Sequence, residues 1–286
     1  MRNQEKWKQA ARIGIPDAHK RKFVLNYLGI DPAEARNQYA LVKSIAGEDF
    51  VNLTRESRMI QSQSTLPDFL TSEAKGELEF MLMYINKKMQ LKTCYLLANL
   101  MQLLMVFLRP AEVYAVIECL RLRTQEISNA SKTDELRWHF TITQQLYNKT
   151  LASFIDSYLR TTHRKKRSVV THCQKVGFDF TQFVDSCFRH FLTDFLPLSS
   201  LLDILLIFLV EGVKSLFRMT YAISKLHKDK IKTFKDRETF ISSLGAHSKS
   251  VMPNSHSLFL KLAFKYPLGS ASKVRFSQQQ VTAIMS

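Results

Sequence analysis

Apolar side chains recur at helical spacing along most of this 286-residue chain, and this periodicity limits the folds open to it. No alternation of apolar and polar residues, the pattern of a half-buried strand, persists anywhere in the sequence. Only eight Gly and seven Pro interrupt the helical pattern. A hydrophobic content of 45% is enough to build one sizeable core. We therefore predict an all-α fold.

The periodic stretches can be bounded by their caps and breaks. Pro16 and Asp17 supply a helix start and Gly29 supplies a stop. The same reasoning predicts helices over residues 17–28, 32–45, 73–88, 93–108, 110–123, 135–159, 179–194, 198–209 and 213–234. A polar break near 128–134 predicts two helical lobes, residues 1–127 and 128–240. Residues 241–286 are predicted to form a tail with a short helix near 258–266.

The charge balance concerns partners and says little about the fold. Lys and Arg number 41 against 25 acids, which gives a net charge of +16. Anionic lipid, nucleic acid and acidic proteins are therefore the candidate classes, beside a basic surface that only aids solubility. Nucleic acid is disfavoured, because no zinc finger and no basic stretch with interleaved aromatic residues is evident.

Several kinds of chemistry lack their sequence signals. The cysteines Cys94, Cys119, Cys173 and Cys187 have no metal-ligand spacing and are predicted to be reduced thiols. No phosphate-binding loop or zinc-protease motif occurs, so we predict neither a metal nor a cofactor. The polar start shows no signal peptide, and the apolar runs 94–108 and 196–210 are too short to span a bilayer. These features predict a cytoplasmic protein, peripheral on membranes or vesicles.

The predicted helix 213–234 carries a row of cations on one side. At about 100° per residue, one narrow sector of the helix contains Lys214, Arg218, Tyr221, Lys225, Lys228 and Lys232. Solvated helix faces usually mix charges of both signs, whereas this sector contains no acid. The row is either an ordinary solvated face or a surface for a phosphate-bearing partner.

Two groups of residues resemble a known family. Trp7 followed by Gly14-Ile15-Pro16 resembles the opening motif of TBC domains, the Rab GTPase-activating family, and residues 208–218 (FLVEGVKSLFR) resemble its closing motif. The resemblance spans about residues 5–235 and is nearest the Skywalker-type branch, although no TLDc domain follows. It implies a two-lobed all-α domain. Asp203 and Leu206 depart from the closing motif, and apolar packing is expected to replace a lost ion pair.

The enzymes of this family use an arginine and a glutamine to accelerate GTP hydrolysis on Rab GTPases. In this sequence the matching positions hold Ser57 and Leu96, so we predict a catalytically deficient domain that is not an enzyme. Arg55 and Arg58 lie beside the first position, and a shift of one residue in the match would restore an arginine. A Rab-binding protein or activator that uses Arg55 or Arg58 is therefore the alternative.

The Skywalker-type branch binds phosphoinositide headgroups through a cationic pocket made by the opening and closing motifs. The resemblance carries this role to Lys20, Lys22 and Arg218, whereas two other pocket cations are replaced by Pro16 and Ala222. Arg21, Lys214 and Lys225 are near enough in sequence to compensate. We therefore predict binding of phosphoinositides or anionic membranes in membrane trafficking, with Rab binding second and nucleic-acid binding third.

Overall fold

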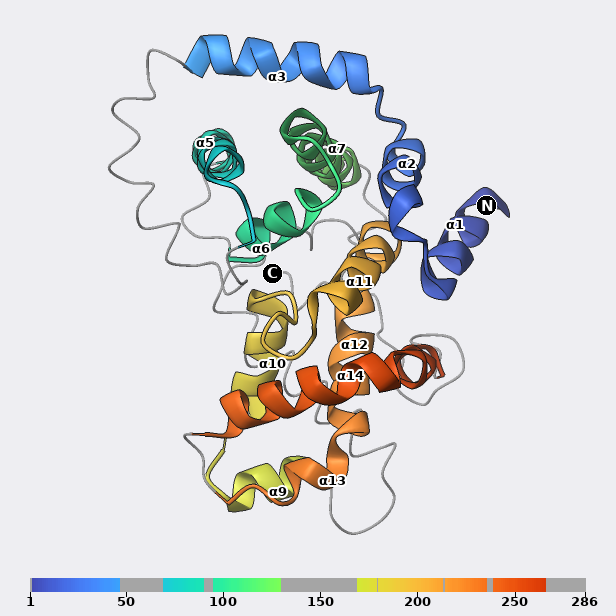
Figure 1. Cartoon of the computed structure of the whole chain (residues 1–286), viewed down its shortest axis with the longest axis vertical. Coiled ribbons are helices and arrows are strands. Elements are labelled where there is room, and N and C mark those ends of the chain that lie inside the picture. Colours follow the sequence, from blue (N-terminus) through green and yellow to red (C-terminus); the bar gives the residue numbers. More distant parts are fainter. Residues whose placement is uncertain are drawn as a thin grey trace. The chain divides into compact units, whose positions relative to one another are not determined.

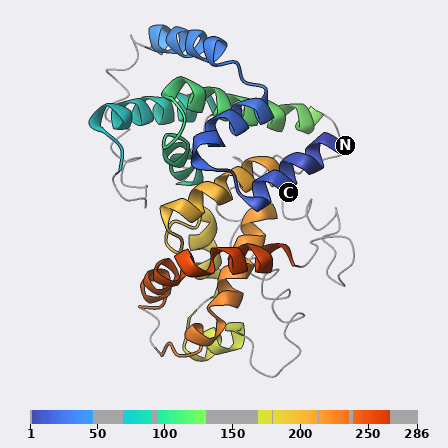
Figure 2. The same ribbon diagram turned by 45° about the vertical axis from the view of Figure 1, so that its right-hand side comes forward.

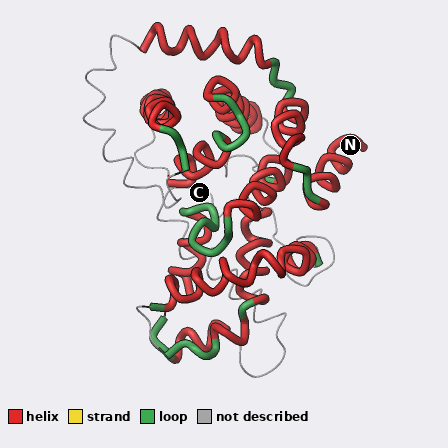
Figure 3. Tube along the Cα trace, in the orientation of Figure 1, coloured by secondary structure: helices red, strands yellow, loops and turns green. Residues whose placement is uncertain are grey.

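The computed structural model describes residues 2–46, 69–89, 95–129, 169–178, 180–212, 214–235 and 239–265. Over these ranges the chain contains helices, turns and loops and no strand (Figure 3). The predicted all-α fold is therefore confirmed. None of the helices in these ranges combines the length and the apolar character needed to cross a membrane.

The chain divides into two compact units, which are described separately. The first contains Met1–Leu136 with Leu205–Val210, and the second contains Arg137–Ile204 with Glu211–Ser286. Helix α11 (Leu198–Glu211) contributes residues to both. The predicted lobe boundary near residue 128 stays a prediction.

The first unit is built around α7. Its helices are α1 (Arg2–Ile13), α2 (Asp17–Leu28), α3 (Pro32–Ala46), α5 (Ser72–Met89), α6 (Tyr95–Leu104) and α7 (Pro110–Asn129). Helices α2, α3, α5 and α6 all pack on α7 (Figures 1 and 2). Helix α6 is apolar on almost every side, and Leu97, Leu100 and Leu103 are fully buried. An all-round apolar helix has to be covered by its neighbours, which explains its central place.

The second unit is organised by the pair α12 and α14. Its helices are α9 (Val169–Lys175), α10 (Phe180–Arg189), α12 (Lys214–Leu226), α13 (Lys228–Ile231) and α14 (Phe240–Phe264). Helix α14 crosses and packs on α12, and α10 packs on α12 as well (Figure 1). The buried phenylalanines Phe183, Phe188, Phe191 and Phe195 fill the core beside them. Large aromatic side chains bury the most apolar area per residue, so these rings supply much of the packing energy.

Three differences from the sequence prediction concern the helices. Helices α1 and α9 are additional to those predicted. The predicted helix 213–234 is two helices, α12 and α13, separated at His227. The predicted short C-terminal helix is the end of α14, which has 25 residues and contains Pro253. The predicted helix 135–159 lies outside the described residues.

Candidate functional site

The opening motif forms a tight turn held by a buried lysine. The Trp7 ring packs edge-on against Phe23, with ring centroids 5.1 Å apart. Gly14, with a φ of 104°, ends α1 in a conformation that side chains with a Cβ rarely adopt. The Lys20 Nζ donates to the Ile15 carbonyl oxygen at 2.8 Å, and Lys20 is only 3% exposed. Lys20 therefore fastens α2 to the turn before it, and a headgroup contact would compete with this bond.

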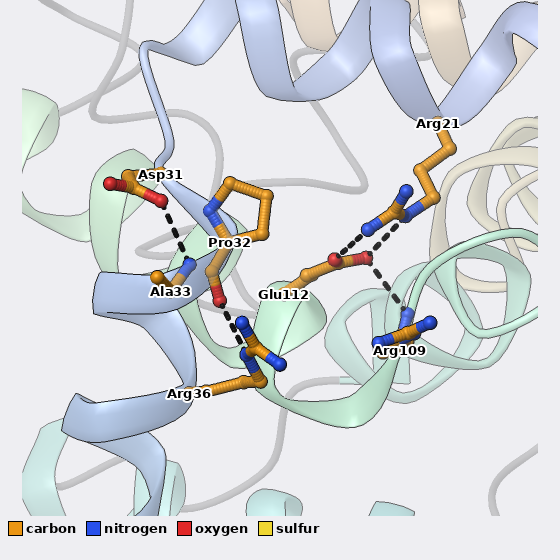
Figure 4. A network of polar contacts seen from close by, with 7 residues as sticks. All are labelled: Arg21, Asp31, Pro32, Ala33, Arg36, Arg109 and Glu112. Carbon is orange, nitrogen blue, oxygen red and sulfur yellow. Dashed lines mark hydrogen bonds and ion pairs between the residues drawn. The ribbon is translucent and has the colours of Figure 1, made fainter.

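Arg21, the next predicted site residue, forms an ion pair with Glu112 (Figure 4). Its Nε donates to Glu112 Oε2 at 3.0 Å and its Nη2 donates to Oε1. The backbone N–H of Arg109 donates to the same Oε2 at 3.1 Å. Arg109 precedes α7 and Glu112 is its third residue. The bond from the Arg109 N–H to the Glu112 side chain is therefore one of the two bonds of a capping box. One carboxylate thus caps α7 and joins it to α2.

The charges of this network reinforce one another. Glu112 is 1% exposed, and burial alone would raise the pKa of its carboxyl. The hydrogen bonds from Arg21 and from the Arg109 backbone outweigh burial, so the pKa lies below its ordinary value. The same contact raises the pKa of Arg21. Glu112 is therefore ionised at neutral pH, and Arg21 is committed to an internal pair. Lys22, by contrast, is exposed.

Of the two positions matched to the catalytic arginine and glutamine, Ser57 and Leu96, only Leu96 lies among the described residues. Leu96 lies in α6 and is 8% exposed, so its side chain belongs to the core of the first unit. Arg55, Ser57 and Arg58 lie outside the described residues. A buried leucine can neither position water nor bind a charged group.

The predicted cation row on α12 is not a continuous exposed surface. Tyr221, predicted to lie in the row, is 3% exposed, which corrects that prediction. The Arg218 guanidinium lies over the ring of Phe264 from α14, 5.2 Å from its centroid. Helix α14 packs across α12, where a tail with one short helix was predicted, and so covers part of the surface of α12 (Figure 1).

Lys225 remains a partly buried cation on the same helix. Its pKa lies below the ordinary value because of burial and because of the charges of Lys228 and Lys265. The structure therefore brings Lys225 together with two lysines outside the set predicted to bind lipid. Arg218 and Lys225 belong to the second unit, as does Lys214, whereas Lys20, Arg21 and Lys22 belong to the first.

The two departures from the closing motif have different surroundings. Leu206 is fully buried. Asp203 lies 3.3 Å from His256, measured between Oδ2 and Nε2, and so pairs with α14. The expected apolar packing is present at Leu206, while Asp203 finds a histidine partner that the sequence prediction did not include.

Glu112 was absent from the sequence prediction, although one part of its role had a signal. Pro110 at the first position of α7 and Glu112 at the third are typical of a helix start. The pairing of Glu112 with Arg21 had no signal, because 91 residues separate them. Only the packing of α2 on α7 brings the two side chains together.

Comparison with known proteins gives matches by structure only. No family model matches the sequence, and no curated protein matches it significantly. The TBC domain of a Chlamydomonas flagellar RabGAP superposes with a TM-score of 0.66 at 15% identity, covering 92% of this chain and 85% of that domain. The Ypt/Rab-GAP domain of Gyp1p superposes with a TM-score of 0.58 at 13% identity, covering 92% of each chain.

These matches overturn the prediction that the chain is not an enzyme. Both matching structures are Rab-GAP domains, which are GTPase activators. The predicted deficiency depended on the weak matches at Ser57 and Leu96, whereas Arg58 adjoins Ser57 and Arg55 lies two residues before it.

The resemblance found in the opening and closing motifs is confirmed at the level of fold. Both structural matches extend over 92% of the chain, far beyond the two motifs, and both are TBC-type domains. The nearness to the Skywalker-type branch stays a prediction. The protein has the all-helical fold of the TBC domain.

Proposed function

We propose that the chain is a GTPase-activator-like domain that acts on a Rab-type small GTPase. The observation that carries the proposal is the fold, which the chain shares over 92% of its length with two Rab-GAP domains. In this reaction an arginine neutralises the charge that develops on the transferred phosphoryl group. Arg55 and Arg58 are the candidates for that arginine, since they flank the matching position.

The proposal is tested by single-turnover GTP hydrolysis on a panel of Rab-type GTPases. The chain is expected to accelerate hydrolysis on at least one of them, and alanine at Arg55 or at Arg58 is expected to reduce that acceleration by about 10³-fold or more. Arg36→Ala is the matched control, because Arg36 is exposed on α3 and its Nε bonds only the Pro32 carbonyl of its own helix (Figure 4). The proposal would be contradicted if the chain accelerated hydrolysis on none of the GTPases. It would also be contradicted if the Arg55, Arg58 and Arg36 variants all accelerated hydrolysis equally.

A second proposal is that the chain binds phosphoinositides or anionic membranes in membrane trafficking. The charge of +16 favours it, together with the exposed Lys22 and the clustered Lys225, Lys228 and Lys265. Each cation near an anionic leaflet contributes about 1 kcal/mol. Because Lys20 and Arg21 are engaged internally, the exposed Lys22 is the best candidate of the three on α2. Arg218 and Lys225 of α12 are candidates for the charge that they carry. Lys214 remains a candidate by sequence.

Liposome co-sedimentation separates this proposal from the first. A Lys22→Ala, Lys225→Ala variant is expected to lose most binding to phosphoinositide vesicles while keeping its effect on GTP hydrolysis. The control is Lys87→Ala, Lys175→Ala, which removes equal charge from exposed residues of α5 and α9. Equal loss of vesicle binding in both variants would show that binding follows the total charge of the protein. That outcome would reject a specific site.

A further inference from the structure

Histidine side chains mark two contacts of α14 within its own unit. The His247 ring lies edge-on to His227, at the junction of α12 and α13, with centroids 5.3 Å apart. Nearer the other end of α14, His256 lies 3.3 Å from Asp203 of α11. Pro253 separates the two contacts and cannot donate the backbone hydrogen bond that a helix expects there. The helix therefore has two anchored halves and a weak point between them.

The contact at His227 tolerates only a neutral ring. His227 is 3% exposed, and its buried Nε2 has no hydrogen-bond partner. A buried imidazolium would need a hydrogen-bond acceptor or a carboxylate as a partner. The ring beside His227 is instead another histidine, His247. Burial and His247 lower the pKa of His227 from 6.5 to about 4. Protonation is thus suppressed while α14 covers His227, so by linkage protons favour the uncovered state.

The other titratable groups around α14 have polar partners. From α10 and the turn after it, Ser186 and His190 bind Asp194, on which Lys249 of α14 also acts. These partners keep the pKa of Asp194 low although burial raises it, so His190 faces a carboxylate.

His256 likewise faces the carboxylate of Asp203. From α9, His172 contacts the Phe234 carbonyl oxygen. The cations Arg218 and Lys225 lie on α12. Among the described histidine contacts of α14, that of His227 is the one in which burial lowers the pKa of the ring.

We propose that residues 240–252 of α14 form an acid-released latch, which leaves α12 when His227 is protonated. Residues 254–264 stay attached through His256 and through Phe259, which is fully buried, and Pro253 is the hinge. Release uncovers His227, at the junction of α12 and α13, together with the buried Phe240, Leu244 and Met252 of α14. The latch does not depend on the proposed GTPase function.

Hydrogen exchange on the full chain at about pH 7 and about pH 5, corrected for the intrinsic exchange rate, tests the latch. The pKa of His227 is 6.5 when the ring is uncovered and about 4 when it is buried. By linkage, amide protection over residues 240–252 is therefore expected to fall by about 20-fold on acidification. Protection over residues 254–264 is expected to change by less than about twofold, since their contacts keep a charge partner. Unchanged protection of both segments would overturn the latch.

Two variants decide whether His227 and His247 are the cause. His227→Phe keeps the ring without a titratable group and is expected to abolish the pH response, whereas His19→Phe, on an exposed position of α2, should retain it. If His227→Phe does not fold, His247→Phe at a half-buried position carries the test. A smaller pH response in that variant supports the latch, and a response equal to that of the wild type overturns it.

Discussion

Gly245→Ala is expected to destabilise the second unit by about 3 kcal/mol. A Cβ on Gly245 of α14 would overlap the backbone oxygen of Asp194 and lie 3.4 Å from its carbonyl carbon. The oxygen cannot easily retreat, because the Asp194 side chain is held by Ser186 and His190. The turn before it contains Phe191 and Leu192, which are fully buried with φ of 51° and 63°. Surroundings that hold two such residues in place resist further movement.

The matched control for Gly245→Ala is Gly76→Ala in α5. An added Cβ at Gly76 would meet no atom within 4 Å, so alanine is expected to stabilise that helix by about 0.5–1 kcal/mol. The opposite signs are measured by urea unfolding followed by circular dichroism, with hydrogen exchange to assign each change to its unit. A Gly245→Ala protein as stable as wild type would show that α14 does not approach Asp194 so closely.

Glu112→Gln is expected to destabilise the first unit by about 2 kcal/mol at neutral pH. The amide keeps the shape of the carboxylate but places an N–H group against the donors of Arg21 or of the Arg109 backbone. The side chain of Arg21 is 43% exposed, which limits the loss to less than that of a fully buried ion pair. Urea unfolding measures the loss, and Glu34→Gln on an exposed site of α3 should change stability by less than about 0.5 kcal/mol.

The difference between wild type and Glu112→Gln should also depend on pH. The folded state holds the pKa of Glu112 below its ordinary value of 4.5, so folding favours the ionised form. Its contribution is fully present above about pH 4.5 and is lost as the pH falls through the lower folded value. The two unfolding curves should therefore converge in acid. A gap that stays constant down to about pH 3 would mean that the charge of Glu112 does not stabilise the fold.

Local signals predicted individual helices well where caps and periodicity agreed. Asp17–Leu28 begins and ends at the predicted residues, because Gly29 adopts the left-handed conformation that stops a helix. Helix α1 was missed because Trp7 and Ala11 are among its few apolar residues, too few for a periodic pattern. Helix α14 was underestimated because Gly245 and Pro253, which usually break helices, lie inside it. Packing on α12 outweighs these local preferences.

The candidate site was predicted less completely than the helices. Charge and spacing identified Lys20, Arg21 and the cations of α12, but they could not distinguish available side chains from engaged ones. Lys20 bonds a carbonyl five residues away, and Arg21 bonds a carboxylate 91 residues away. The prediction of a non-enzyme failed for a different reason: it rested on weak matches around Ser57 and Leu96, whereas the shared fold covers 92% of the chain.

The sequence by itself determined the all-α class, the bounds of its best capped helices and the likeness of its end motifs to TBC domains. These properties follow from periodicity, caps and short motifs, which act over a few residues. Only the tertiary structure decided that Glu112 pairs with Arg21, that Tyr221 is buried and that Gly245 must lack a side chain. Such contacts join residues far apart in the chain, and their energy arises only when packed helices exclude water and fix the distances between groups.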